Sequence, residues 1–520
     1  MTASRTAGAA RRHWLQQALA GTAAAVAAPL FVHHARAADT SRFALGVASG
    51  QPQPQDVVLW TMLTGADLPV QAEVRWEIAE DEAFTRIAAR GVETARAEDA
   101  HSVHAEPAGL QPERGYFYRF EALGQRSPVG RTRTAPAPDA RVQRLHFITA
   151  SCQRYDVGHY AAWRHAAAEA PDLVLFLGDY IYEYGRDASP AGAPRQHEGG
   201  KVRTLAGYRA RYAQYKSDPA LQAAHAAAPW LMVWDDHEVD NDYAGLQGQD
   251  LQPDFAAQRA AAYQAYWEFL PWPKAARPVG GAMRITGRLD WGRLARLHLL
   301  DTRQYRDAQA CPRPGRGGSN TVDVAECPAL LARGRSLLGA AQEQWLAEGW
   351  ALDRPWNLLA QQTLMARCSW ADPAGPTGGR YWTEGWDGYA ATRARLLGTA
   401  AERRVPGLVS LGGDVHTHYV AELKADYDDA KAPVIGSEFV GTSISSLGLP
   451  QSRLDTLRPI NPHLLHVRGD QRGYQSFVLE PGRLQAQLQV VADARLPDSA
   501  LQTQARFAVE AGRPGPQRQS

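Results

Sequence analysis

Four short, mostly apolar runs along the chain each end at residues whose side chains bind metal ions. The runs cover residues 145–148, 173–177, 231–234 and 408–411. The residues that follow them are, in the same order, Cys152, Asp179 with Tyr182, Asp235 with Asp236, and Asp414 with His416. Runs of this kind, bounded by turn signals, are typical of strands buried on both faces. Because ligands bind beyond the carboxyl ends of such strands, the pattern predicts a multinuclear metal site in an α/β sheet.

The segment before these runs has a different pattern. Residues 72–78 and 115–122 alternate apolar and polar side chains, as half-buried strands do, and residues 57–63 are also strand-like. We therefore predict an all-β sandwich over residues 38–136. Its end, residues 110–136, resembles the end of a fibronectin type III domain.

A Pro/Ala-rich linker follows, and we predict a catalytic domain over residues 137–495. There, strands alternate with helical stretches at 159–170 and 204–225, which indicates βα units. Apolar residues at helical spacing predict a further helix over residues 331–350.

Residues 496–520 are predicted to be a C-terminal tail. From Pro514 the chain is polar, which is typical of disorder. Residues 500–509 could form a helix near the site, and the sequence leaves this open.

The first 37 residues have the pattern of an export signal. Arg11 and Arg12 precede an apolar segment at 18–32, and residues 35–37 form an A-x-A cleavage site. The arginine pair resembles a twin-arginine signal, although an ordinary secretory signal is the alternative. We predict a periplasmic or secreted protein, exported by the twin-arginine machinery, with no membrane span once the signal is removed.

Charge and cysteine content bear on the partners of the protein and on its disulfides. The 520-residue chain has 56 basic and 55 acidic residues and no polybasic run, which argues against nucleic acid as a partner. Cys311 and Cys327 flank a Pro/Gly-rich stretch, and we predict a disulfide between them. Tryptophans cluster at residues 370–386, where they either pack in the core or line a pocket.

Taken together, the motifs resemble those of PhoD-type alkaline phosphatases and occur in that family's order. They are Phe43 to Gly50, Ser151-Cys152, Gly178-Asp179-Tyr180-Ile181-Tyr182, Trp234-Asp235-Asp236-His237-Glu238-Val239, Leu300 to Arg306, Trp386-Asp387-Gly388-Tyr389 and Gly413-Asp414-Val415-His416-Thr417-His418. The resemblance implies an N-terminal β-sandwich followed by an αββα metallophosphoesterase domain. Asp301, Thr302 and Arg303 match the family, but a structural ion pair or hydrogen-bond set is the expected role for them.

The residue types indicate which metals suit the site. A thiolate and a phenolate favour a trivalent iron, whereas carboxylates favour calcium or magnesium. The resemblance implies Fe(III) held by Cys152, Asp179, Tyr182 and Asp414, with Ca(II) nearby. The candidate calcium ligands are Asp235, Asp236, Asn241, Asp242 and His416. Many relatives have asparagine at the position of Asp242, so this chain adds a carboxylate there.

The expected reaction is hydrolysis of small-molecule phosphate mono- or diesters by metal-activated hydroxide, which releases inorganic phosphate. His237, His416 and His418 are the candidates to donate a proton or hold the phosphate. His416 is favoured as a metal or phosphate ligand, and His418 is expected to lie outside the set of ligands. Arg154 either faces the phosphate or is a solvated surface arginine. The alternatives are a phosphodiesterase or phospholipase D-like hydrolase on the same metals, and a non-catalytic binding protein.

Overall fold

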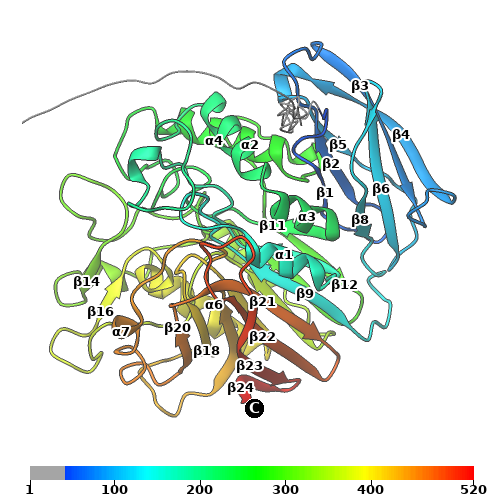
Figure 1. The fold of residues 1–520 in the computed structure, drawn as a ribbon. Coiled ribbons are helices and arrows are strands. Elements are labelled where there is room, and N and C mark those ends of the chain that lie inside the picture. The colour runs from blue at the N-terminus through cyan, green and yellow to red at the C-terminus, as the bar shows by residue number, and fades with distance from the viewer. Residues whose placement is uncertain (1–40) are drawn as a thin grey trace, which may run out of the picture. The chain divides into compact units, whose positions relative to one another are not determined.

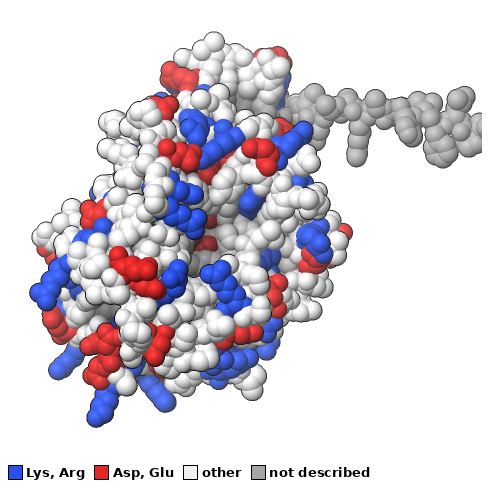
Figure 2. All heavy atoms as spheres, turned by 90° about the vertical axis from the view of Figure 1, so that its left-hand side faces the viewer, with Lys and Arg blue, Asp and Glu red and all other residues white. Residues whose placement is uncertain are grey.

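The computed structural model describes residues 41–520. The export signal predicted over residues 1–37 lies outside the described residues. No helix among residues 41–520 is long and apolar enough to span a bilayer. Basic and acidic side chains are intermixed on the face drawn in Figure 2.

Three of the four apolar runs form adjacent parallel strands of a ten-stranded sheet. In order of pairing, its strands are β24 (Arg513–Gln519), β23 (Leu501–Glu510), β22 (Arg483–Val491), β21 (Arg472–Leu479), β9 (Leu145–Ala150), β10 (Leu173–Phe176), β11 (Pro229–Met232), β1 (Val47–Gly50), β2 (Val58–Met62) and β5 (Ser102–Ala105). Every residue of β10 and β11 is buried, as expected for strands covered on both faces.

The fourth run forms a strand of a second, seven-stranded sheet. In order of pairing, its strands are β12 (Gly287–Trp291), β13 (Ala295–Leu299), β15 (Trp356–Ala360), β17 (Leu408–Gly412), β19 (Val434–Val440), β18 (His418–Lys424) and β20 (Leu464–Arg468). The four strands β13, β15, β17 and β19 run parallel. The residues that follow β17 therefore reach the site from a different sheet than those that follow β9, β10 and β11.

The two sheets pack face to face through aromatic side chains. Phe477 on β21 stacks on Phe147 with 4.8 Å between ring centroids, and meets the edge of Phe439 on β19 at 5.4 Å. All three side chains belong to one hydrophobic cluster that spans both sheets. This shared core fixes the distance between the strand ends of the two sheets.

Helices cover the outer faces of the sheets (Figure 1). Trp163 of α1 packs on Phe176 and Trp230, which lie on the face opposite Phe147. The helices are α1 (Ala161–Ala168), α2 (Leu205–Lys216), α3 (Pro219–Ala227) and α4 (Phe255–Phe269) with the first sheet, α5 (Ala340–Glu348) and α6 (Ala390–Glu402) with the second, and α7 (Gln451–Leu454).

Two helix predictions need correction. The stretch 204–225 is two helices, because Asp218 caps α3 with Pro219 as its first residue and so interrupts the helical pattern. The predicted helix 331–350 is confirmed only for α5. Gly339 precedes it with a φ of 74°, a left-handed conformation that a continuous helix does not allow.

The N-terminal segment is rich in β structure, and part of it continues the ten-stranded sheet. A separate five-stranded sheet consists of β4 (Ile87–Arg96), β3 (Gln71–Ala79), β6 (Gly115–Ala122), β7 (Gln125–Arg126) and β8 (Gly130–Arg133). It shares one hydrophobic cluster with β1, β2 and β5. Because Ser49 of β1 pairs in parallel with Pro229 of β11, the N-terminal segment is joined to the site-bearing sheet by backbone hydrogen bonds.

The C-terminal residues differ from the prediction of a disordered tail. Residues 501–510 form β23 instead of a helix, because they pair antiparallel with β22 along their length, and Ala505, Phe507 and Val509 join the hydrophobic core on one face. Residues from Pro514 lie in β24, which tolerates two prolines because it is the edge strand of the sheet.

The predicted disulfide between Cys311 and Cys327 is confirmed. The other two cysteines, Cys152 and Cys368, are buried free thiols.

Replacing Phe477 by alanine should lower the free energy of unfolding by about 3–5 kcal/mol, since it empties the contact between the sheets. Denaturant unfolding measures the effect. Leu352→Ala is the control, because Leu352 is 52% exposed and its loss should change the stability by less than about 0.5 kcal/mol. Equal unfolding midpoints for the two variants would contradict the shared core.

Candidate metal centre

The backbone turns sharply where the strands end. Cys152, Asp179, Asp414 and His416 have φ angles between 50° and 63°, a left-handed conformation that costs a non-glycine residue about 1–3 kcal/mol. Gly178 has a φ of 108°, and a Cβ there would lie 2.4 Å from the Cβ of Asp235. The loops are therefore held in strained conformations that turn these side chains toward one another.

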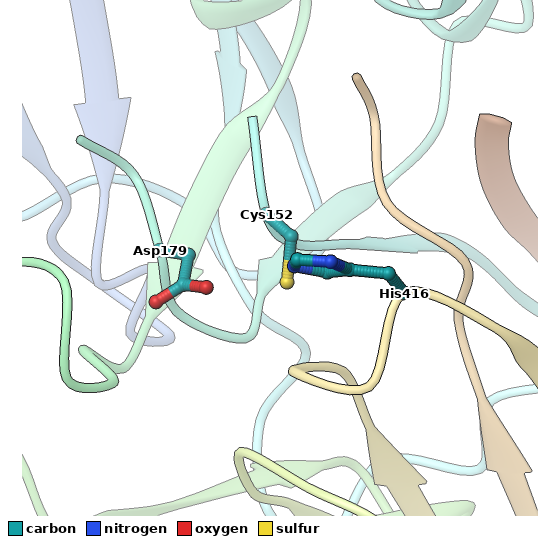
Figure 3. A group of neighbouring side chains, drawn as sticks. All are labelled: Cys152, Asp179 and His416. Atoms are coloured by element: carbon teal, nitrogen blue, oxygen red, sulfur yellow. The ribbon is translucent and has the colours of Figure 1, made fainter. Parts of the chain in front are cut away.

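The first group of candidate ligands contains a thiol, a carboxylate and an imidazole. The ligand atoms of Cys152, Asp179 and His416 lie within 4.8 Å of one another, and come from three separate segments (Figure 3). Tyr182 belongs with them, because its hydroxyl donates to Asp179 Oδ2 (2.8 Å) and lies 3.1 Å from His416 Nε2. Ser446 Oγ donates to the same hydroxyl (2.8 Å).

Two oxygen-rich groups lie beside this one. Asp179 groups with Asp236 and His237, and Asp236 groups in turn with Asp235 and Asp414. Asp179 and Asp236 are thus shared between groups, as residues that bridge neighbouring metal ions would be. Asp414, expected as an iron ligand with Cys152, groups with Asp235 and Asp236, and its charge also acts on the Cys152 thiol.

Burial and mutual repulsion set the protonation of the site. Burial raises the pKa of Asp179 well above its usual range, and the charges of Asp236 and Asp235 add to this. Burial likewise raises the pKa values of Cys152 and Tyr182. For Asp235, burial raises the pKa to about 6 even though Arg303 opposes the shift.

The residues fit a set of metal cations. Within these ligand groups, and among the described residues, Asp235 Oδ2, Asp236 Oδ1 and Asp414 Oδ2 are buried without a hydrogen-bond donor. Asp236 Oδ1 has only a long ion pair with Arg303, at 3.4 Å. Unpaired buried carboxylate oxygens are costly, so they are normally paired or coordinate metal. The oxygen set suits hard divalent ions, and the thiol and phenol beside it suit iron.

In a fourth acidic group, arginine side chains offset part of the negative charge. It consists of Asp236, Asp242 and Glu384. Glu384 accepts from Arg303 and from Arg306 (2.6 Å). The Asp242 carboxylate accepts from Ser319 N (2.9 Å) and Ser319 Oγ (2.6 Å). The added charge of Asp242 is therefore already hydrogen-bonded on one oxygen.

Arg303 lies inside the site and forms no ion pair with Asp301, although Asp301 does hold the local hydrogen-bond set that was the other expectation. Its guanidinium forms ion pairs with Asp235 and with Asp236 (3.4 Å). Asp301 contacts only its backbone, where Asp301 Oδ1 accepts from Arg303 N at 2.9 Å. The pairing joins residues 68 positions apart, so spacing in the sequence gives no sign of it.

Two buried glutamates position the site, and sequence reasoning assigned neither a role. Glu238 accepts from three backbone N–H groups, those of Asp179 (3.1 Å), Tyr180 (2.6 Å) and Asp235 (2.8 Å). It therefore ties the loop after β10 to the loop after β11. Glu183 accepts from His237 Nδ1 (2.7 Å), and His237 also stacks on the Tyr182 ring at 4.0 Å.

The predicted catalytic residues are only partly brought together. His416 Nδ1 donates to Leu447 O (2.7 Å), which leaves Nε2 facing Tyr182; burial lowers the pKa of His416 to about 3. Arg154 instead donates to both carboxylate oxygens of Asp156, at 2.7 and 2.9 Å. Asn241, predicted as a calcium ligand, accepts from Tyr184 OH at 2.9 Å.

A cavity of about 450 Å³ opens onto these groups. One part is lined by ligand candidates, including Asp179, Asp236 and Asp414. Another part is apolar and aromatic, and includes Trp370 and Trp382. The sequence left open whether the tryptophans pack in the core or line a pocket. Trp386 does both, because it is fully buried and borders the cavity, whereas Trp370 and Trp382 are half-buried and line the cavity.

Known proteins of similar sequence and structure agree with this picture. The family model described as "PhoD-like phosphatase" matches residues 147–488, and "PhoD-like phosphatase, N-terminal domain" matches residues 25–136. Alkaline phosphatase D of Bacillus subtilis (strain 168) is 42% identical over 488 residues, which covers 91% of this chain and 82% of that protein. A solved structure described as "Structure of PhoD" matches with a TM-score of 0.87 and 39% identity, over 93% of each chain.

Replacing Glu238 by glutamine should lower metal content and kcat/KM by about 10–100-fold, because one amide oxygen cannot accept from three backbone N–H groups. Elemental analysis and initial rates measure the two effects. Glu268→Gln is the matched control, since Glu268 is equally buried but pairs with Arg209 away from the site. Wild-type metal content and activity in Glu238→Gln would show that Glu238 does not position the ligands.

Proposed function

The chain belongs to the PhoD-like phosphatase family and is a phosphoric ester hydrolase, and on that premise we propose that it is an exported alkaline phosphatase that uses Fe(III) and Ca(II). Its substrates would be small-molecule phosphate esters, and inorganic phosphate its product. The observation that supports this most strongly is the meeting of three ligand groups at one end of a cavity large enough for an organic ester.

The metals are assigned by ligand chemistry. Cys152, Tyr182 and Asp179 would hold Fe(III), with Asp414 as the fourth ligand implied by the family resemblance. The proposed Ca(II) ligands are Asp235, Asp236, Asn241, Asp242 and His416. Bound cations lower the pKa of water and neutralise charge on the phosphoryl group.

His237 is the best-supported proton donor to the leaving alkoxide. Its Nδ1 is fixed by Glu183, which leaves Nε2 for the cavity that the ring lines. For His416, the hydrogen bond from Nδ1 to a backbone carbonyl supports a role as a metal or phosphate ligand through Nε2. Arg154 is the least supported of the three, because it does not border the cavity and its guanidinium donates to Asp156 and to Ala188 O.

We also propose the finer description of the fold. Two facing sheets with helices outside them support an αββα metallophosphoesterase domain that begins near residue 137. It extends beyond the expected boundary at 495, because β23 and β24 belong to the first of these sheets. The core shared by β1, β2, β5 and the five-stranded sheet supports a fibronectin type III-like sandwich over residues 38–136. Export by the twin-arginine machinery to the periplasm or medium rests on residues 1–37 alone.

A phosphodiesterase, including a phospholipase D-like hydrolase, is the second candidate. The cavity volume of about 450 Å³ favours it, since it leaves room for groups beyond the phosphoryl. The non-catalytic alternative predicts the loss of at least one ligand, whereas each of the four strand ends keeps its ionisable residue.

The test is hydrolysis of a chromogenic monoester and its bis-ester by natively exported protein at mildly alkaline pH, with and without a calcium chelator. We expect turnover that the chelator removes and added Ca(II) restores. The preferred ester distinguishes phosphatase from phosphodiesterase. Chelator-resistant turnover would contradict the calcium assignment, and no turnover of either ester by metal-loaded protein would contradict the proposed function.

Asp236→Asn should lower kcat/KM by at least about 100-fold, because Asp236 is shared between ligand groups and metal stabilisation of the transition state is worth several kcal/mol. Initial rates with saturating metal give the value. Asp250→Asn is the matched control, since Asp250 pairs with Lys201 and Arg203 outside the cavity and should retain full activity. Equal activity of the two variants would show that Asp236 is not a ligand at the metal site.

A further inference from the structure

The cavity beside the ligand groups is much larger than the reacting group requires. It has a volume of about 450 Å³, within the range of pockets that bind drug-sized ligands. The ligand candidates occupy only one part of its lining. The remainder includes Leu364, Leu447 and Leu449 as well as tryptophans.

Two half-buried tryptophans form the aromatic part of this wall. Trp382 lies at the end of β16 (Arg380–Trp382), which pairs with β14 (Thr321–Asp323) in a small sheet of its own. Trp370 N donates to Arg380 O (2.8 Å), so the two tryptophan-bearing segments are joined by a backbone hydrogen bond. Neither ring belongs to the fully buried core, and both border the cavity. A half-buried indole on a fixed segment offers a π face at little conformational cost.

An arginine lies over one of these rings. The guanidinium carbon of Arg453, on α7, is 4.7 Å from the Trp370 ring centroid, and Arg453 also borders the cavity. Among the described residues no carboxylate forms an ion pair with it. Arg303 and Arg306, by contrast, are buried and paired with Glu384. Arg453 is therefore an exposed cation at the cavity that is available to an anionic ligand.

We propose that Trp370, Trp382 and Arg453 form a subsite for the organic part of the ester, specific for a planar aromatic group that bears a second negative charge. The inference rests on the proposed phosphoesterase function and adds a substrate class to it. The indole rings favour an aromatic ring over an aliphatic one, because aromatic pairs gain about 0.5–1.5 kcal/mol beyond the area they bury. The guanidinium suits a carboxylate or a further phosphate, to which it can donate two hydrogen bonds.

The planar group is tested with three esters of primary alcohols, whose leaving alkoxides are similarly basic: 2-phenylethyl, 2-cyclohexylethyl and ethyl phosphate. Each is assayed as the monoester and as the methyl diester. We expect wild-type kcat/KM to be highest for the phenylethyl ester. In Trp370→Leu and Trp382→Leu, kcat/KM for that ester should fall about tenfold relative to ethyl phosphate, mainly through KM.

Trp345→Leu is the matched control, because Trp345 lies on α5 outside the cavity and packs on Arg288. Turnover of ethyl phosphate at the wild-type rate shows that a variant is folded and metal-loaded. Trp382→Phe keeps a ring and should recover part of the preference. Equal losses for the phenylethyl and cyclohexylethyl esters, or unchanged ratios, would overturn the subsite. If wild-type protein hydrolyses none of the esters, the proposed function fails instead.

The cation is tested with 2-(4-carboxyphenyl)ethyl phosphate against 2-phenylethyl phosphate. Arg453→Gln should lower kcat/KM for the carboxylated ester about threefold or more, with no change for the uncharged ring, and added salt should shrink the difference. Arg458→Gln is the control, since Arg458 is exposed nearby but does not border the cavity. Equal effects on both esters would show that Arg453 does not bind the second negative charge.

Discussion

Repulsion between buried carboxylates is the constraint on which the rest of this structure depends. Asp179, Asp235, Asp236 and Asp414 form overlapping groups with ligand atoms within 4.8 Å. Two like charges 4 Å apart repel by about 4 kcal/mol at an effective dielectric constant of 20. Arg303 offsets part of this through Asp235 and Asp236, but one guanidinium cannot neutralise four carboxylates. The arrangement therefore requires further cations or retained protons. Burial raises the pKa of Asp179 most, and the charges of Asp236 and Asp235 raise it further.

The fold resists this repulsion with clamps in each sheet. In the first, Glu238 binds the backbone N–H groups of the loops that bear Asp179 and Asp235. In the second, Glu438 on β19 accepts from Met365 N (2.8 Å) and Ala366 N (2.7 Å), next to the cavity residue Leu364. Burial raises the pKa of both glutamates to about 7. Glu238 thus holds the strained loop at Asp179, and Glu438 fixes the segment that follows the cavity residue Leu364.

Sequence reasoning was accurate where the chemistry is local in the chain. Apolar runs followed by Cys152, Asp179, Asp235 and Asp414 correctly predicted buried strands whose ends converge. It was least accurate where partners are remote or where one pattern fits two structures. The role of Arg303 depends on Glu384, 81 residues away. Residues 501–510, for which a helix was considered, are a strand because they pair with β22. Composition could not decide whether Trp370 and Trp382 pack in the core or line the cavity. The answer depends on remote residues such as Arg453 and Leu447, which line the cavity with them.

The most direct test of this account is elemental analysis of the natively exported protein, with the thermal unfolding midpoint measured before and after metal removal. If cations hold the carboxylates together, the protein will contain stoichiometric iron and calcium, and removing them will lower the midpoint at pH 8, where the carboxylates must ionise. The account would be contradicted if the active protein contained no stoichiometric metal. It would also be contradicted if metal removal changed neither the unfolding midpoint nor the activity.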